Sequence, residues 1–175
     1  LAYEDMPLPI DSGQTISQPF IVALMTSALE LAETDRVLEI GAGSGYQAAI
    51  LSRLVPKGRV LTLERIPNLA DTARAFLQGL GCANVTVRLA SRALGAPEDA
   101  PFDAILVTAG APRLPPTLLE QLAPGGRIVV PVGSLREQEL IKATRTDEGT
   151  SYKMLGPCRF VPLIGEGAWS EGEGG

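Results

Sequence analysis

The chain has 175 residues and a net charge of −5, from 15 basic and 20 acidic side chains, with 45% hydrophobic residues and no histidine. This length fits one folded domain with a sizeable core, and no apolar run approaches the roughly 20 residues that a membrane span needs. The acidic balance argues against a nucleic-acid partner, because such binding depends on Lys and Arg at phosphates. Without histidine, Ser-His-Asp and Cys-His nucleophile systems and His-ligated metal sites are excluded, and we expect no metal.

The cysteine content and the first residues bear on the compartment. Cys82 and Cys158 are the only cysteines, and we expect both to be unpaired thiols of a cytoplasmic protein. The opening "LAYEDMPLPIDSG" has neither the basic start nor the apolar region of a secretory signal. Because the sequence begins with Leu1 rather than methionine, we expect further residues before it in the native protein.

In chain order, the first predicted element is a helix with Ser17 as its N-cap and Pro19 in its first turn, ending near Glu33. Short apolar runs then predict five strands, at residues 36–40, 59–64, 85–89, 102–107 and 127–132. Helices are predicted at residues 46–55, 67–80 and 117–122. Residues 139–145 and 151–160 flank the turn "TDEG" and predict an antiparallel pair.

These alternating elements predict an α/β fold. We expect a doubly wound, mostly parallel seven-stranded sheet with helices on both faces and a C-terminal antiparallel hairpin. No internal repeat or linker divides the chain, so residues 1–164 are expected to form a single domain. The Gly- and Glu-rich residues 165–175 predict a disordered tail.

The stretch "LEIGAGSGYQAAIL" places three glycines between an apolar strand and the start of a helix. Such a turn presents bare backbone amides to a polar or anionic group. A P-loop would close the turn with Gly-Lys-Ser/Thr, whereas Tyr46 and Gln47 follow Gly45 here. A dinucleotide fingerprint would read G-x-G-x-x-G, but Gly41, Gly43 and Gly45 read G-x-G-x-G. Neither a nucleoside triphosphate nor NAD therefore matches the turn.

Two acidic residues flank this turn. Glu39 precedes it, where a carboxylate would oppose a pyrophosphate but could hold an ammonium group, directly or through water. Glu64 ends the next strand, where a carboxylate can accept hydrogen bonds from both hydroxyls of a ribose. This pattern fits S-adenosylmethionine, which joins an amino acid to a nucleoside without phosphate. The alternative is a plain tight turn with structural glycines and surface acids.

Five sequence blocks follow one another along nearly the whole chain: "YEDMPLPIDSGQTISQPFIVALMT", "LEIGAGSGYQAA", "PFDAILVTAGAP", "LAPGGRIVVPVG" and "RFVPL". Through them the chain resembles the protein-L-isoaspartate O-methyltransferase family. The resemblance implies a Rossmann-like methyltransferase fold. It also implies methyl transfer from S-adenosylmethionine to the free carboxylate of L-isoaspartyl residues in damaged proteins and peptides. A carboxylate is already ionised at neutral pH, so this reaction needs no general base, in agreement with the lack of histidine.

The resemblance also implies site residues. Ser17 would be the catalytic residue, with its hydroxyl donating to the incoming carboxylate, and Thr15 and Val161 would also bind substrate. The residues implied to hold the cofactor are Glu39, Gly41, Ala42, Gly43, Ser44, Gly45, Glu64, Arg65, Ser91 and Arg92. The implied partners are isoaspartyl proteins and peptides, for a monomeric enzyme that needs neither nucleic acid nor membrane. For Ser17 the alternative is a purely structural N-cap.

One triplet departs from the family. After the third predicted strand the family has Gly-Asp-Gly, whose aspartate contacts the adenine, and this chain has Ala90, Ser91 and Arg92. Ser91 lacks the charge, and Arg92 replaces a glycine that lets the adenine approach closely. Two alternatives therefore stand beside the repair methyltransferase. One is a weak or inactive relative that binds isoaspartyl peptides or partner proteins, and the other is a methyltransferase for a different carboxylate.

Overall fold

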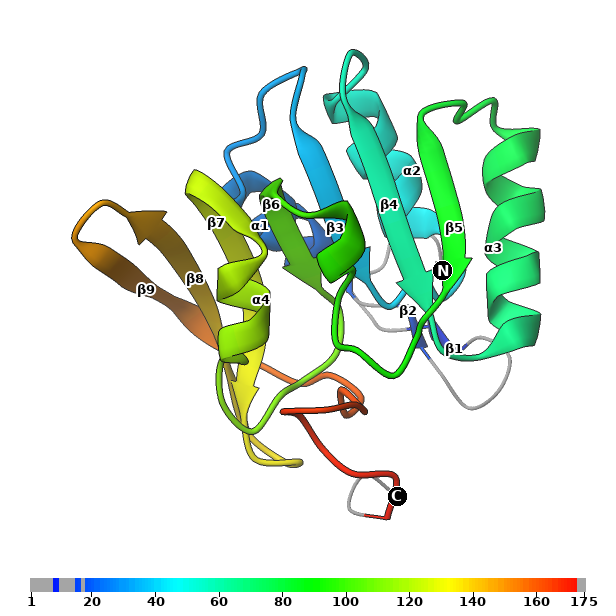
Figure 1. Ribbon diagram of the computed structural model, residues 1–175. Coiled ribbons are helices and arrows are strands. Elements are labelled where there is room, and N and C mark those ends of the chain that lie inside the picture. Colours follow the sequence, from blue (N-terminus) through cyan, green and yellow to red (C-terminus); the bar gives the residue numbers. More distant parts are fainter. Residues whose placement is uncertain (1–7, 10–14, 17, 173–175) are drawn as a thin grey trace.

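The centre of the fold is one seven-stranded sheet, shown with its helices in the computed structural model of Figure 1. The structure describes residues 18–172, together with the backbone of residues 8–9 and 15–16. The strands lie in the order β5-β4-β3-β6-β7-β8-β9, with parallel pairing from β5 to β7 and antiparallel pairing for β8 and β9. The predicted α/β fold with its C-terminal antiparallel hairpin is confirmed.

The strands of this sheet are β3 (Arg36–Ile40), β4 (Arg59–Glu64), β5 (Val85–Leu89), β6 (Phe102–Val107), β7 (Leu122–Gly133), β8 (Gln138–Thr146) and β9 (Gly149–Cys158). The first four have the predicted bounds, whereas β7 begins at Leu122 rather than Arg127. The sequence did not predict the small antiparallel pair of β1 (Leu8–Pro9) and β2 (Thr15–Ile16).

The helices are α1 (Pro19–Ala28), α2 (Tyr46–Leu54), α3 (Pro67–Gly79) and α4 (Pro116–Glu120), with the short 3-10 helix η2 (Pro97–Asp99). Figure 1 shows α4 in front of the sheet and α1 and α2 behind it. Within the described part of the chain, no helix has both the length and the apolar character needed to cross a bilayer.

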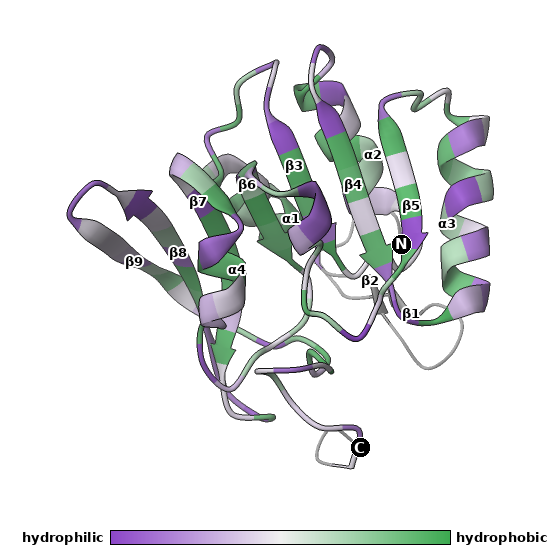
Figure 2. Cartoon of the chain, viewed as in Figure 1, coloured by the Kyte–Doolittle hydropathy of each residue, from purple (hydrophilic) through white to green (hydrophobic). Residues whose placement is uncertain are grey.

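The core consists of two main clusters, one on each face of the sheet. Met25 of α1 and Leu51 of α2 pack with Leu106 of β6 on the rear face. Leu118 of α4 packs with Ile105 of β6 on the front face. Because both faces are covered, the central strands are apolar along most of their length, as Figure 2 shows in green.

The first helix is shorter than predicted. It ends at Ala28 rather than near Glu33, because Glu30 adopts a φ of 49°, outside the right-handed helical region. The Arg127 side chain of β7 donates hydrogen bonds to the carbonyls of Leu29 and Glu30, at 2.7 and 2.9 Å. These bonds satisfy carbonyl groups that the end of a helix leaves without partners.

The C-terminal segment, residues 165–172, passes below the carboxyl ends of the parallel strands (Figure 1). Trp169 holds it there: the ring Nε1 donates to the carbonyl of Gly110 at 3.0 Å, and the backbone amide donates to Leu163 at 3.0 Å. The amide of Gly165 donates to the carbonyl of Trp169 and closes a short loop. Composition predicted a disordered tail, yet this part of it has defined contacts through one aromatic side chain among the glycines.

Candidate cofactor and substrate site

A cavity of about 870 Å³ opens at the carboxyl edge of the sheet. From β3 the chain moves to β4 and β5 on one side and then returns to β6 on the other, so the strand order reverses at this point. Doubly wound sheets bind ligands at such a reversal, and the volume suits a nucleoside-sized ligand. The predicted site residues that line the cavity are Gly41, Ala42, Gly43, Ser44, Glu64, Arg65, Ser91, Arg92 and Val161.

The glycine turn forms the wall beside β3. Gly41 has a φ of +102°, and a Cβ there would collide with the hydroxyl of Thr108, the residue after β6. That hydroxyl lies 3.0 Å from the carbonyl of Ile40 and 2.8 Å from the carbonyl of Gly41. Gly43 is also left-handed, with a φ of 52°. Gly45 does not line the cavity, and its close contacts are with α3, which indicates a packing role.

Glu64 joins the glycine turn to the end of β4. Its Oε2 accepts a hydrogen bond from the amide of Gly43, and its Oε1 accepts one from the amide of Ile66, both at 2.9 Å. An ionised carboxylate offers about four lone-pair sites, so acceptor capacity remains for ligand hydroxyls. This geometry suits the predicted contact with a ribose.

Glu39 lies behind the cavity wall rather than in it. The residue is fully buried in β3, opposite Thr62 of β4, and neither carboxyl oxygen has a hydrogen-bond partner among the described residues. The pKa of Glu39 is raised to about 8, mainly because burial disfavours the charged form. The neighbouring Thr62 side chain lowers this pKa, and the charge of Glu64 raises it by a smaller amount. The direct contact with an ammonium group that the sequence allowed does not fit this burial, and the cofactor role of Glu39 stays a prediction.

Ser91 and Arg92 line the end of the cavity near Glu64. The Ser91 hydroxyl donates to the carbonyl of Ala93 at 3.3 Å, and the chain there is tied to β4 by a backbone hydrogen bond. Arg92 is exposed and has no hydrogen-bond or ion-pair partner among the described residues. Arg65 forms an exposed ion pair with Glu171 of the C-terminal segment at 3.7 Å. This end of the cavity therefore carries cationic side chains near the triplet that departs from the family.

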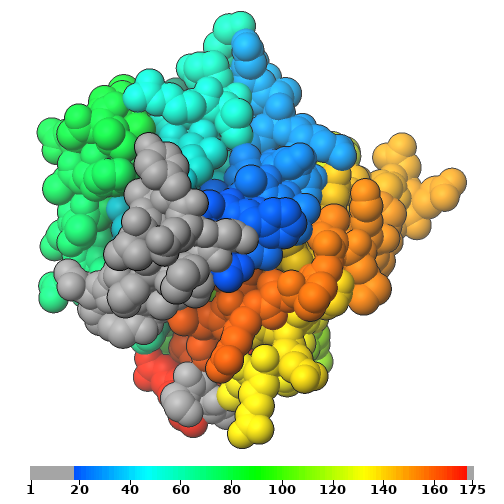
Figure 3. Space-filling model, turned by 180° about the vertical axis from the view of Figure 1, so that it is seen from behind, coloured from blue at the N-terminus to red at the C-terminus, as the bar shows by residue number. Residues whose placement is uncertain are grey.

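The opposite side of the cavity is formed by residues 157–165 and the start of α1. Figure 3 shows the chain after β9, in orange, beside the blue α1 on the rear face. Val161 lies in this segment after Phe160, whose amide donates to Gln138 Oε1 at 2.8 Å. Gln138 Nε2 in turn donates to the carbonyl of Phe160 at 3.2 Å. Sequence reasoning missed Gln138 and Thr108, because a single Gln or Thr beside a strand carries no recognisable pattern.

Two predicted substrate-binding residues fall at the start of the chain. Ser17 lies outside the described residues, and of Thr15 only the backbone in β2 is described. α1 begins at Pro19, with Gln18 at the N-cap position, one residue later than predicted; a capping role of the Ser17 side chain lies outside the described residues and stays a prediction. The substrate role of Ser17 and Thr15 stays a prediction.

The thiols and the acidic side chains offer no further reactive centre among the residues that the structure describes. Cys82 and Cys158 are unpaired. Burial raises the pKa of Cys158 to about 11, with a smaller rise from the charge of Glu139, so this thiol stays protonated at neutral pH. Within the same part of the chain, no three His, Cys, Asp or Glu side chains lie together as a metal site would require.

Comparisons with known proteins agree with this geometry. A family model for protein-L-isoaspartate(D-aspartate) O-methyltransferase matches residues 1–168. Protein-L-isoaspartate O-methyltransferase 1 of Syntrophobacter fumaroxidans is 55% identical over 168 residues, which are 96% of this chain and 78% of that protein. The protein-L-isoaspartate O-methyltransferase of Trichlorobacter lovleyi is 57% identical over 169 residues, 96% of this chain and 77% of that protein.

Two solved structures share the fold. One protein-L-isoaspartate O-methyltransferase aligns with a TM-score of 0.85 and 34% identity over 95% of this chain, which spans only 55% of that protein. A Plasmodium falciparum protein described as a protein-L-isoaspartate O-methyltransferase, in complex with S-adenosyl-L-homocysteine, aligns with a TM-score of 0.82 and 26% identity, over 95% of this chain and 83% of that one. The match of the family model to nearly the whole chain, together with these identities, shows that the chain belongs to the protein-L-isoaspartate(D-aspartate) O-methyltransferase family.

Proposed function

We propose that this chain transfers the methyl group of S-adenosylmethionine to the free carboxylate of L-isoaspartyl residues in damaged proteins and peptides. The family model over residues 1–168 and the relatives at 53–57% identity support this reaction. The bound S-adenosyl-L-homocysteine of the Plasmodium relative supports the cofactor. These relatives favour an active repair enzyme over the non-catalytic alternative and over a methyltransferase for another carboxylate.

The single observation that carries the cofactor assignment is the arrangement of Glu64. Its two oxygens accept hydrogen bonds from the amides of Gly43 and Ile66, and the side chain borders the cavity. In this proposal its remaining lone pairs accept the ribose hydroxyls. The backbone from Gly41 to Ser44 borders the amino-acid part of the cofactor, and Ser91 and Arg92 flank the adenine.

The reaction needs alignment more than proton transfer. The bound cofactor supplies a methyl group on a positively charged sulfur. A substrate carboxylate with a pKa near 4 is ionised at neutral pH, so no side chain has to remove a proton from it. The chain's task is to hold a carboxylate oxygen in line with the methyl group and to exclude water. In the proposal, Val161, Thr15 and the Ser17 hydroxyl perform that positioning.

The test is methyl transfer to matched peptides. Methyl-labelled S-adenosylmethionine is incubated with the protein and with two peptides that differ only in an isoaspartyl or an aspartyl linkage. The proposal expects label in the isoaspartyl peptide alone. Equal labelling of both peptides contradicts the proposal, and so does the absence of label from both peptides at saturating cofactor. Calorimetric binding of S-adenosyl-L-homocysteine measures the cofactor step separately.

The same proposal describes a monomeric, cytoplasmic enzyme that requires neither nucleic acid nor a membrane surface. The unpaired Cys82 and Cys158 support a reducing compartment. The net charge of −5 disfavours a polyanionic partner. Size-exclusion chromatography with light scattering tests the oligomeric state.

A further inference from the structure

The cavity has a cationic lining in a chain that is acidic as a whole. Among its described lining residues are Arg65, Arg92 and Arg159, and Glu64 is the single acidic one, although the net charge of the chain is −5. Arg65 and Arg92 lie beside the strands β4 and β5, at the proposed nucleoside end. Arg159 lies near β9, at the other end of the sheet order. The proposed function leaves this third arginine without a role.

The backbone that carries Arg159 is held in a fixed position. Cys158, the last residue of β9, pairs in register with Gln138, the first residue of β8. The Gln138 side chain then makes two hydrogen bonds with the backbone of Phe160, at 2.8 and 3.2 Å. Arg159 stands between these two anchored residues, in the same wall of the cavity as Val161. Its exposed guanidinium has no hydrogen-bond or ion-pair partner among the residues the structure describes.

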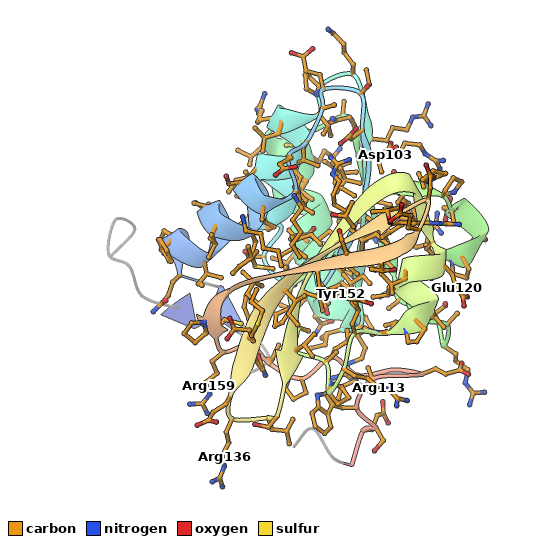
Figure 4. The ribbon with its side chains drawn as sticks, turned by 90° about the vertical axis from the view of Figure 1, so that its left-hand side faces the viewer. Asp103, Arg113, Glu120, Arg136, Tyr152 and Arg159 are labelled. Atoms are coloured by element: carbon orange, nitrogen blue, oxygen red, sulfur yellow. The ribbon has the colours of Figure 1, made fainter. Side chains whose placement is uncertain are left out.

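A second arginine lies at the same corner of the molecule. Arg136 belongs to the turn between β7 and β8, which is held by hydrogen bonds from the amides of Arg136 and Glu137 to Ser134 Oγ, at 3.2 and 3.0 Å. Figure 4 shows Arg159 and Arg136 at one corner, with Arg113 on the other side of the fold. Within the described chain, neither arginine of this corner forms an ion pair with the neighbouring Glu137 or Glu139.

We propose that Arg159, assisted by Arg136, is a specificity-determining residue that favours isoaspartyl segments with an acidic side chain next to the isoaspartyl residue. The inference rests on the proposed function. An acidic chain repels an acidic segment at long range, whereas an unpaired guanidinium at the cavity mouth attracts it at short range. Interactions of this exposed kind act mainly on capture of the substrate and are weakened by salt. We therefore expect kcat/KM to be about threefold to tenfold higher for a peptide with an acidic neighbouring residue than for one with a neutral neighbour, mainly because KM is lower.

The experiment compares three isoaspartyl peptides that are identical except for one neighbouring residue, which is Glu, Gln or Lys. That residue is placed before the isoaspartyl position in one set and after it in a second set. Initial rates of methyl transfer are measured for the native chain, for Arg159→Gln, Arg159→Glu and Arg159→Lys, and for the control Arg113→Gln. Arg113 is a matched control because it is exposed, has no partner among the described residues and does not line the cavity.

The expected result in the native chain is a higher kcat/KM for the Glu peptide than for the Gln peptide in at least one set, with the excess shrinking as salt rises. Arg159→Gln brings that ratio close to one, Arg159→Glu turns the preference toward the Lys peptide, and Arg159→Lys restores most of the ratio. Arg113→Gln keeps the native ratio. A native ratio of one or less in both sets overturns the inference, as does an unchanged ratio in Arg159→Gln. If the Gln peptide is methylated without any charge preference, only the inference fails; if no isoaspartyl peptide is methylated, the proposed function fails with it.

Discussion

The amide of Gly43 donates a hydrogen bond to Glu64 Oε2 at 2.9 Å, which ties the glycine turn after β3 to the carboxyl end of β4. The carboxylate holds the turn in place, and the amide in turn orients the carboxylate. Because Oε1 accepts from the amide of Ile66, both oxygens are positioned before any ligand arrives. Preorganised acceptors of this kind lower the cost of binding, since less freedom is lost when the ligand is held.

The first prediction concerns this carboxylate. Glu64→Gln replaces one acceptor oxygen with an amide NH2 that would face a backbone N–H, so one hydrogen bond to the chain or to the ribose is lost. We expect the Kd for S-adenosyl-L-homocysteine to rise about tenfold to a hundredfold, and the melting temperature to fall. Calorimetry and thermal unfolding measure the two effects. The matched control is Glu33→Gln, an exposed carboxylate paired with Lys57, which should leave the Kd at its native value. An unchanged Kd in Glu64→Gln would remove Glu64 from the cofactor site.

The second prediction is a pH dependence of stability from Glu39. Its pKa is raised to about 8 in the folded chain from an ordinary value of 4.5, because burial disfavours the charge. The unfolded chain therefore releases this proton more readily. The contribution of the neutral Glu39 carboxyl to the free energy of unfolding is fully present below about pH 4.5. It is lost between about pH 4.5 and about pH 8, at up to about 1.4 kcal/mol per pH unit.

Glu39→Gln removes this titration but keeps the shape of the side chain. Without cofactor, the free energies of unfolding of the native chain and the variant should be similar near pH 4.5. Above that pH the variant should become the more stable of the two, by a margin that grows until about pH 8. Urea unfolding across this range measures the difference. A margin that does not change with pH would show that Glu39 has an ordinary pKa.

The third prediction concerns the first glycine of the turn. Gly41→Ala places a Cβ against the Thr108 hydroxyl at a φ of +102°, so we expect a loss of about 1–3 kcal/mol in the free energy of unfolding. Cofactor binding should weaken as well, because the turn borders the cavity. Gly79→Ala is the control: Gly79 is helical, and apart from its chain neighbours and the backbone of its own helix no atom lies within 4 Å of the position that its Cβ would take. This variant should therefore be neutral or more stable by up to about 1 kcal/mol. A Gly41→Ala variant as stable as Gly79→Ala would contradict the tight turn.

The fourth prediction concerns the triplet that departs from the family. Ser91→Asp with Arg92→Gly should tighten the binding of S-adenosyl-L-homocysteine about fivefold to a hundredfold. A carboxylate accepts from the adenine amino group better than a hydroxyl does, and glycine lets the base approach. The competing arrangement has Arg92 stacked on the adenine. Titrations of the native chain, the double variant and Arg92→Ala decide between them. No gain in the double variant, together with weaker binding by Arg92→Ala, would assign Arg92 a supporting contact.

Most of the sheet could be predicted because its strands are short apolar runs between turn residues. β3, β4 and β6 have the predicted bounds, since burial on both faces leaves little choice of side chain. The edge strand β5 also has the predicted bounds, although its residues are half-buried or exposed. The end of α1 could not be predicted, because the local pattern continues past Ala28 and a positive φ at Glu30 stops the helix. The backbone at this end of the helix is hydrogen-bonded by the side chain of Arg127, a residue that is distant in sequence.

Some residues of the candidate site could likewise be predicted from the sequence, and others could not. Gly41, Gly43 and Glu64 could be found from spacing, because a turn of this kind needs bare backbone and an acceptor at the end of the next strand. Burial of Glu39 behind the wall could not be read from the sequence, where it differs from Glu64 only in position. Thr108 and Gln138 act through hydrogen bonds to the backbone of distant segments, and that function leaves no periodic signal.

Trp169 is the only tryptophan of the chain, and its ring N–H donates to the carbonyl of Gly110 beside the cavity. Intrinsic fluorescence excited at the indole band therefore comes from one known place in the fold, without labelling or mutation. A shift of that emission during titration with S-adenosyl-L-homocysteine or with an isoaspartyl peptide would report on the C-terminal segment alone. The same signal, followed in denaturant, separates release of this segment from unfolding of the sheet that supports it.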